Sequence, residues 1–329
     1  MFLRALMCLL LVVTCPVLPA WAVDLTPFTV RNLSPAALVH GLAVAEPARL
    51  TPPGRLSARL GFDIISNATL SDSANESILF DGESYVTTFG LRYGIAERLQ
   101  IGLDLPWVAH TKGSFDSFVE DWHKFFGLPN GDRSHLPDDE LTYAYANASG
   151  DQLLLDDESS GVGDARLLVA WQLLANQQSA ASLFTSIKAP TGDADDLTGS
   201  GAWDVSIGLS AQRDFPLAQG YASVWGGLGG SWLGDGDVLE NQAEDWAASV
   251  WAGAGWSPLD WLGLKLQLDS HSALYDSALD ELGNPPLILT LGGTLGFGER
   301  TSLDIGVGED LAVNASPDVT FHLNLVHKF

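Results

Sequence analysis

The stretch Leu262-Gly-Leu-Lys-Leu-Gln-Leu-Asp269 alternates strictly between leucine and a small or polar residue. Side chains two residues apart in a β-strand lie on the same face of the sheet, so this stretch predicts a strand with one apolar and one polar face. The same alternation recurs near residues 56–64, 99–107 and 287–297. No run of 18 apolar residues follows residue 22, so the pattern favours an all-β fold without helical membrane spans.

Alternation of this kind occurs in half-buried sheets of soluble proteins and in the walls of membrane barrels, and the length of the runs favours the barrel. Many runs reach roughly 11–14 residues, whereas strands of soluble proteins usually have about 5–6 and a tilted membrane strand needs about 9–11. We therefore expect twelve strands, near residues 55–65, 83–95, 98–110, 162–174, 180–190, 202–213, 219–232, 245–256, 260–273, 286–297, 300–309 and 317–329.

The connections and the C-terminus point the same way. Short links such as 96–97 and 298–299 follow the even strands, and longer links follow the odd ones, the longest covering residues 111–161. Short periplasmic turns and long outer loops organise outer-membrane barrels. The alternation that ends in Phe329 is similar to the terminal signature by which the barrel-assembly machinery recognises its clients, although His327 stands where a second aromatic residue is usual. The sequence thus predicts a transmembrane antiparallel β-barrel of about 12 strands.

The first 22 residues have the features of a secretory signal peptide. Arg4 precedes the apolar run 5–13, and Ala20-Trp21-Ala22 is a small-residue cleavage pattern. We expect residues 1–22 to be removed and the mature chain to reside in the bacterial cell outer membrane. Residues 23–53 are rich in proline and are expected to form a periplasmic arm or an inner plug, while residues 54–329 form the barrel.

Cysteine usage and charge exclude several classes of function. Both cysteines, Cys8 and Cys15, lie in the signal segment, so the mature chain has no thiol for a disulfide, a metal site or a nucleophile. The chain has 41 acidic and 16 basic residues, which disfavours nucleic acid as a partner. Most acids fall in the expected outer loops. These loops are either simply solvated or bind divalent cations, with residues 193–196 and 234–237 as candidate sites.

The alternation also predicts which charged side chains face the lumen. They carry both signs in similar number, so they either form a salt-bridged interior or line a water-filled passage. Twelve strands lie between the filled barrels of about eight strands and the open ones of about 16–18, so the strand number does not decide. The expected lumen-lining residues are Arg59, Asp63, Arg92, Asp104, Asp164, Arg166, Lys188, Asp204, Lys265, Asp269 and Asp304.

Residues 114–126 in the long loop break the strand pattern and follow helical spacing instead. Ser114 suits a helix N-cap, and Gly127 can end the helix. We expect this helix in one of three places: in the barrel mouth as a constriction, on the membrane surface by its aromatic face, or against neighbouring loops. The candidate gate residues on it are Phe115, Phe118, Trp122, His123 and Phe126.

The same loop carries a resemblance to a known family. The stretch Phe115-Asp-Ser-Phe-Val-Glu-Asp-Trp-His-Lys-Phe-Phe-Gly-Leu-Pro-Asn-Gly-Asp-Arg133 resembles the signature loop of an uncharacterised bacterial family, domain-of-unknown-function family 3187. The stretches Gly161-Val-Gly-Asp164 and Lys188-Ala-Pro-Thr-Gly-Asp193 fit as well, and they recur more widely among outer-membrane channel-like proteins. The resemblance covers nearly all of the mature chain and implies a barrel with a long early loop, but no activity.

Catalytic motifs are weak. His271 lies beside Ser270 and Ser272, but adjacent residues of a strand point to opposite faces, and His123 and Asp121 do not share a helix face.

We expect no enzyme and no cofactor, with lipid and lipopolysaccharide of the outer membrane as partners. The leading hypothesis is a channel or facilitator for a small solute. The alternatives are a structural or surface-binding barrel with a blocked lumen and, third, a lipid-modifying enzyme.

Overall fold

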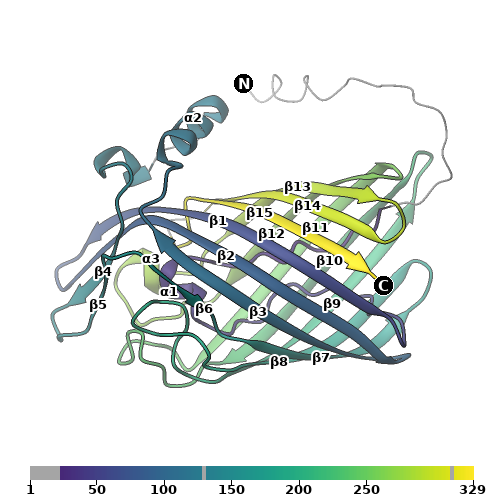
Figure 1. Cartoon of the computed structure of the whole chain (residues 1–329), viewed down its shortest axis with the longest axis horizontal. Helices are drawn as coiled ribbons and strands as arrows, with labels where there is room; N and C mark the ends of the chain where they lie inside the picture. The colour runs from purple at the N-terminus through teal and green to yellow at the C-terminus, as the bar shows by residue number, and fades with distance from the viewer. Residues whose placement is uncertain (1–22, 128–130, 312–314) are drawn as a thin grey trace.

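The computed structural model describes residues 23–127, 131–311 and 315–329, which form a closed β-barrel (Figure 1). The predicted signal peptide lies outside the described residues. The wall is a 12-strand antiparallel sheet, and pairing of its first and last strands from Ser57↔Lys328 to Ser66↔Val319 closes it. Its strands are β1 (Leu56–Asp72), β2 (Glu76–Ala96), β3 (Leu99–Thr111), β7 (Arg166–Ala175), β8 (Ser179–Lys188), β9 (Asp204–Pro216), β10 (Tyr221–Trp232), β11 (Trp246–Leu259), β12 (Leu262–His271), β13 (Ile288–Phe297), β14 (Thr301–Asp310) and β15 (Val319–Lys328).

The predicted all-β barrel is confirmed, and each expected strand has a counterpart within a few residues. The largest difference concerns β1 and β2, which are longer than expected. Their pairing continues to Asp72↔Ser77, so most of the expected loop between them is a hairpin that extends beyond the barrel. The extension was missed because polar residues such as Ser71 and Asp72 weaken the alternation there.

The long loop between β3 and β7 carries the expected helix, α2 (Asp116–Phe126), which ends at Gly127 with a φ of 73°. A 3-10 helix, η2 (Gly131–His135), and three short strands that the sequence analysis did not predict follow: β4 (Thr142–Asn147), β5 (Gln152–Leu155) and β6 (Ser159–Val162). β4 pairs with the extension of β2, β5 with β4, and β6 with β3. Two further short helices are α1 (Pro35–Leu38) and α3 (Asp280–Gly283).

Burial along the strands is the reverse of that in a soluble protein. In neighbouring positions of β12, Leu266 is 47% exposed and Gln267 is fully buried; in β13, Leu291 is 51% exposed and Thr290 fully buried. The apolar faces therefore point outward and the polar faces inward, as in a barrel surrounded by lipid. No helix among the described residues is long and apolar enough to cross a membrane.

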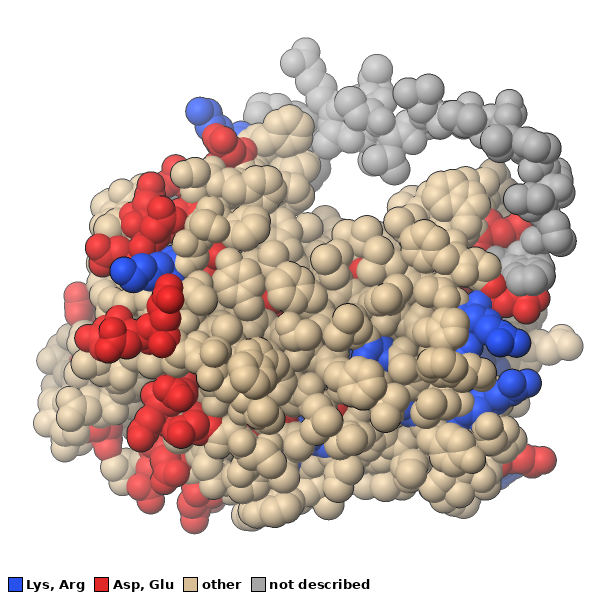
Figure 2. All heavy atoms as spheres, in the orientation of Figure 1, with Lys and Arg blue, Asp and Glu red and all other residues tan. Residues whose placement is uncertain are grey.

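The two ends of the barrel differ. Short turns join the strands at one end, which we call the short-turn end, and both Val23 and Phe329 lie there, since Val23 bonds to Asp260 of the β11–β12 turn and Phe329 to Leu56. The opposite, long-loop end carries α1, α2, α3 and β4–β6 (Figure 1). On the face that Figure 2 shows, acidic residues gather at the long-loop end, most of the visible lysines and arginines lie toward the other end, and a largely uncharged band lies between them.

Candidate functional site in the barrel lumen

Residues 23–53, which we call the lumenal segment, run inside the barrel. The segment enters at the short-turn end, where the Val23 amide donates to the Asp260 carbonyl at 2.7 Å. It reaches α1 near the long-loop end and returns, so that the Thr51 amide donates to the Gln100 side chain at 2.7 Å, and Pro53 forms a bridge with Gly94. Figure 1 shows this purple stretch within the wall. The segment is thus a hairpin whose two ends lie at the same rim.

Glutamine side chains of the wall form the hydrogen bonds with the backbone of the segment that a neighbouring strand would otherwise form. The Gln267 amide accepts from the Phe28 N–H and donates to the Phe28 carbonyl, both at 3.0 Å. Gln172 does the same on the returning half, donating to the Ala48 carbonyl at 2.7 Å and accepting from the Leu50 N–H at 3.0 Å. Backbone groups buried away from water need such partners, and here uncharged polar side chains supply them.

Charged wall residues hold the segment nearer the long-loop end. Asp204 accepts from the Gly41 N–H at 2.6 Å, Lys188 donates to the Val39 carbonyl at 2.9 Å, and Arg166 donates to the His40 carbonyl at 2.7 Å. A side chain at position 41 would overlap with the wall, because a Cβ there would lie 2.6 Å from the Asp204 Cβ. Glycine at position 41 therefore permits the close approach of segment and wall.

Lys188 is the centre of a buried ion-pair network. Its Nζ lies 2.6 Å from an Asp164 oxygen and 3.1 Å from an Asp204 oxygen, and the three side chains are 2%, 6% and 1% exposed. The Asp164 carboxylate also accepts from the Gly192 and Ser200 amides. Charges this deeply buried persist only when they are paired and hydrogen-bonded, and this network meets both conditions.

Further ion pairs join the segment and the wall near the short-turn half of the lumen. Arg92 binds Asp104 at 2.9 Å and Glu46 of the segment at 2.7 Å, while Arg59 binds Asp104 at 3.0 Å. Two more pairs lie within the wall, Lys265–Asp304 at 2.8 Å and Asp63–His322 at 2.6 Å.

The structure places each of the eleven charged residues expected in the lumen on the inner side of the wall. Most of them belong to the ion pairs described above, whereas Arg166 bonds to segment carbonyls and Asp269 accepts from Gln267 at 3.0 Å. Charge alone does not indicate the other inward-facing polar residues, which are Arg31 and Glu46 of the segment, His322, and the glutamines at positions 100, 172 and 267. Position 267 lies on the polar side of the quoted alternation, so that alternation could have indicated it.

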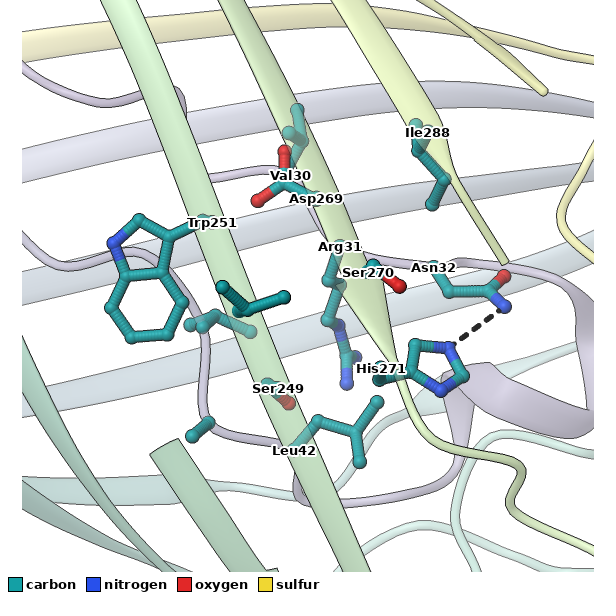
Figure 3. A pocket seen from close by; sticks show the side chains of 13 residues that line it. Val30, Arg31, Asn32, Leu42, Ser249, Trp251, Asp269, Ser270, His271 and Ile288 are labelled. Carbon is teal, nitrogen blue, oxygen red and sulfur yellow. Dashed lines mark hydrogen bonds between the residues drawn. The ribbon is translucent and has the colours of Figure 1, made fainter. Parts of the chain in front are cut away.

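Little space remains between the segment and the wall. One cavity, lined by residues that include Arg31, Asn32, Asp269 and His271, has a volume of about 20 Å³ (Figure 3). A second, between Arg31, Arg166 and Lys188, has about 10 Å³. Each is about the size that one water molecule needs. At these places the lumen offers no passage to a solute.

An apolar cluster closes the long-loop end. Ala36, Ala37 and Val39 of the segment pack with residues of the outer loops and of the β2 extension, among them Tyr143, Leu197, Leu233, Val238, Leu274 and Tyr275. The Tyr275 hydroxyl donates to the Ala36 carbonyl at 2.9 Å and lies 2.8 Å from the His40 Nε2. The loops therefore fold inward onto the tip of the segment.

The residues considered for catalysis are engaged elsewhere. The His271 Nδ1 lies 2.6 Å from the Ser272 carbonyl oxygen, and its Nε2 lies 3.1 Å from the Asn32 side-chain nitrogen (Figure 3). Neither ring nitrogen meets a serine hydroxyl, which a histidine-activated nucleophile requires. Among the residues that the structure describes, no group of three or more His, Cys, Asp or Glu side chains is arranged to hold a metal ion.

Helix α2 lies outside the barrel. The rings of Phe115, Phe118 and Trp122 pack on Phe321 with centroid distances of 6.5, 5.7 and 6.1 Å. Phe321 shares the outward face of β15 with Leu323, whereas His322 and Asn324 point inward. The hypothesis that Phe115, Phe118, Trp122, His123 and Phe126 form a gate does not fit this placement, because the wall separates them from the lumen.

Arg133 anchors the loop that carries α2. It forms ion pairs with Asp116 and, at 3.1 Å, with Asp318, and it donates to the Ser66 hydroxyl at 2.8 Å. Its side chain is buried. Burial raises the pKa of Asp318 to about 6 despite the opposing effect of the Arg133 charge. The anchor therefore includes a carboxyl group that titrates in a mildly acidic range.

We expect the anchor to weaken as the pH rises from about 4 to 6. A carboxyl group whose pKa is higher in the folded than in the unfolded state stabilises the fold fully when the pH lies below the unfolded pKa. This contribution is lost as the pH rises through the folded pKa. The shift corresponds to at most about 3 kcal/mol. A nitroxide on Ser134→Cys should report increasing loop mobility over this range, and Asp318→Asn should remove the dependence. The same pH profile in Asp318→Asn would assign the effect to another group.

The fold and the inverted burial define this protein as a transmembrane antiparallel β-barrel. A family model places it more closely: the chain belongs to the family described as Protein of unknown function (DUF3187), which matches residues 5–329. No curated protein matches the chain in sequence.

Several solved structures are similar. An outer membrane channel from Pseudomonas putida F1 has a TM-score of 0.55 and 16% identity, over 86% of this chain and 98% of that one. The NanC porin has a TM-score of 0.45 and 7% identity, over 83% of this chain and 100% of that one. The KdgM porin has a TM-score of 0.42 and 6% identity, over 82% and 99% respectively. At such identities the first likeness shows the barrel fold alone.

Proposed function

We propose that this protein is an outer-membrane channel for a small polar solute, and that the lumenal segment is its gate. The short-turn end then faces the periplasm and the long-loop end the cell exterior. The observation that carries the proposal is the way the segment is held: its backbone bonds to wall glutamines, Asp204, Lys188 and Arg166 rather than to a neighbouring strand. Water or a polar solute can take over such bonds when the segment leaves, because they end on side chains that also suit an aqueous passage.

A second candidate function has support from the apolar cluster at the long-loop end. Tyr143, Leu197 and Tyr275 pack on the tip of the segment as in a protein core. Apolar contacts of this kind are not replaced by water without cost, so they favour a permanently filled barrel with a structural or surface role. The two candidates differ in one measurable property, namely conductance of the intact protein.

A disulfide between the segment and the wall tests the gate. A Cβ at Gly296 would lie 3.5 Å from the Val23 Cβ, which is within the range of disulfides. The mature chain has no cysteine of its own, so the Val23→Cys/Gly296→Cys pair would be the only one. In planar bilayers we expect the intact protein to open rarely, the oxidised pair to open less often because the free end of the segment is held at the rim, and the reduced pair to behave as the intact protein.

The two single-cysteine variants are the controls for this experiment. Equal opening of the oxidised pair and the single variants would show that the free end of the segment need not move. Complete absence of conductance in the intact protein under all voltages would contradict the channel proposal and favour the filled barrel.

A further inference from the structure

Helix α2 presents aromatic side chains that the described chain leaves half or largely exposed. Phe125 is 80% exposed, and Phe118 and Phe126 are about half exposed. Phe118 and Phe125 are seven residues apart, so two helical turns bring them to one side of α2. Ser117, Glu120, Asp121 and Lys124 occupy the other side. A short helix that exposes phenylalanines along one side and charges along the other suits a boundary between apolar and aqueous surroundings.

The position of α2 on the barrel identifies that boundary. Phe321, on which the helix packs, lies two residues inside the long-loop end of β15 and points outward. Outward-pointing tryptophans mark the same end on other strands: Trp232 ends β10 and Trp246 begins β11, and the two are paired. Aromatic residues collect at this depth in membrane barrels, where hydrocarbon meets head groups.

Polar contacts hold α2 against the wall with its aromatic side free. The Trp122 Nε1 donates to the Glu309 carboxylate at 2.9 Å, and His123 lies 3.7 Å from the same carboxylate. Glu309 points outward at the end of β14, since it shares a face with the exposed Ile305. The helix therefore covers the outward carboxylate of Glu309, and its aromatic side adjoins the apolar outer face of β15 at Phe321.

We infer that α2 is an interfacial helix that inserts Phe118, Phe125 and Phe126 into the outer lipid leaflet beside β14 and β15. Its exposed aromatic side is continuous with the lipid-facing surface of β15, so the same lipids that surround Leu323 also contact α2. The Arg133 anchor fixes the loop at this height by joining Asp116 at the start of α2 to Asp318, next to β15. The occupant of this surface is thus lipid, not solute.

Single-cysteine labelling measures the depth of the helix. Nitroxides would be placed at Phe125→Cys, at Lys124→Cys as the matched control on the polar side, and at Leu323→Cys as a reference on the lipid-facing wall. Phosphatidylcholine vesicles with and without lipopolysaccharide would carry the full mature protein. The substitutions at positions 124 and 125 lie at exposed sites and leave the Arg133 anchor intact, and the heat-dependent shift in gel migration of a folded barrel would verify folding.

We expect the label at position 125 to collide with oxygen, which concentrates in lipid, to nearly the same extent as the label at 323. The label at 124 should collide instead with a water-soluble nickel chelate. The inference is overturned if positions 124 and 125 are equally accessible to the chelate in both kinds of vesicle, because α2 would then stand in water and present its aromatic side to another partner.

Discussion

Deleting residues 24–50 should turn a mostly closed barrel into a steadily open one. The deletion removes the chain that fills the lumen and retains Thr51, Pro53 and the whole wall. It also removes Ala36, Ala37 and Val39, on which the outer loops pack, so the apolar cluster at the long-loop end loses its centre. Wall residues that bond to the segment in the intact protein, such as Gln172 and Gln267, would face water, which can form their hydrogen bonds instead.

Single-channel recording in planar bilayers is the measurement for this deletion. We expect long openings with little voltage dependence, and only weak selectivity between cations and anions because both signs line the wall. Adding a synthetic peptide of residues 23–50 to the side of the short turns should reduce the current. A folded deletion variant that does not conduct would mean that the loops or the wall close the lumen without the segment, and the gate proposal would fail.

Replacing Lys188 by alanine should cause the largest loss of stability among substitutions of a single lumenal residue. The change leaves the carboxylates of Asp164 and Asp204 buried next to each other without their shared cation. Removing one partner of a buried ion pair typically costs about 3–5 kcal/mol. It also removes the hydrogen bond to the Val39 carbonyl, so the tip of the segment should become more mobile.

Urea unfolding in lipid vesicles and bilayer recording would measure the two effects of Lys188→Ala together. Combining Lys188→Met with Asp164→Asn and Asp204→Asn removes the whole charged group and should recover most of the stability, because no charge is then left unpaired. An unchanged unfolding midpoint in Lys188→Ala would show that water reaches these carboxylates, and thus that the lumen is far wetter than the packing of the segment indicates.

The wall of this barrel could be predicted from the sequence, because strand periodicity is a local property. Alternation around Leu264, Leu266 and Leu268 requires no knowledge of neighbouring strands, and it also separates outward from inward side chains. That is why the position of Lys265 inside the barrel follows from the pattern. The partners of these inward residues do not follow from it, since Lys265 and Asp304 are paired across 39 residues.

The path of residues 23–53 could not be predicted for a different reason. Prolines interrupt any periodicity there, and the segment is fixed by contacts that are distant in the sequence, such as Phe28 with Gln267, 239 residues apart. The position of α2 was equally open, because Phe118 and Trp122 suit a pore mouth, a loop cluster or a membrane surface alike. The contact with Phe321, far along the chain, excludes the pore mouth.

The hairpin course of the lumenal segment has a topological consequence. The pairing of β1 with β15 closes the strands of the wall into a ring. A chain that passed from one mouth of this ring to the other would be threaded, and it could leave only if one of its ends were pulled through the ring. Here both halves of the hairpin begin at the short-turn rim, so the hairpin is not threaded through the ring. The barrel can close before, during or after the hairpin enters, and it can be emptied and refilled many times without breaking one bond of the β1–β15 seam.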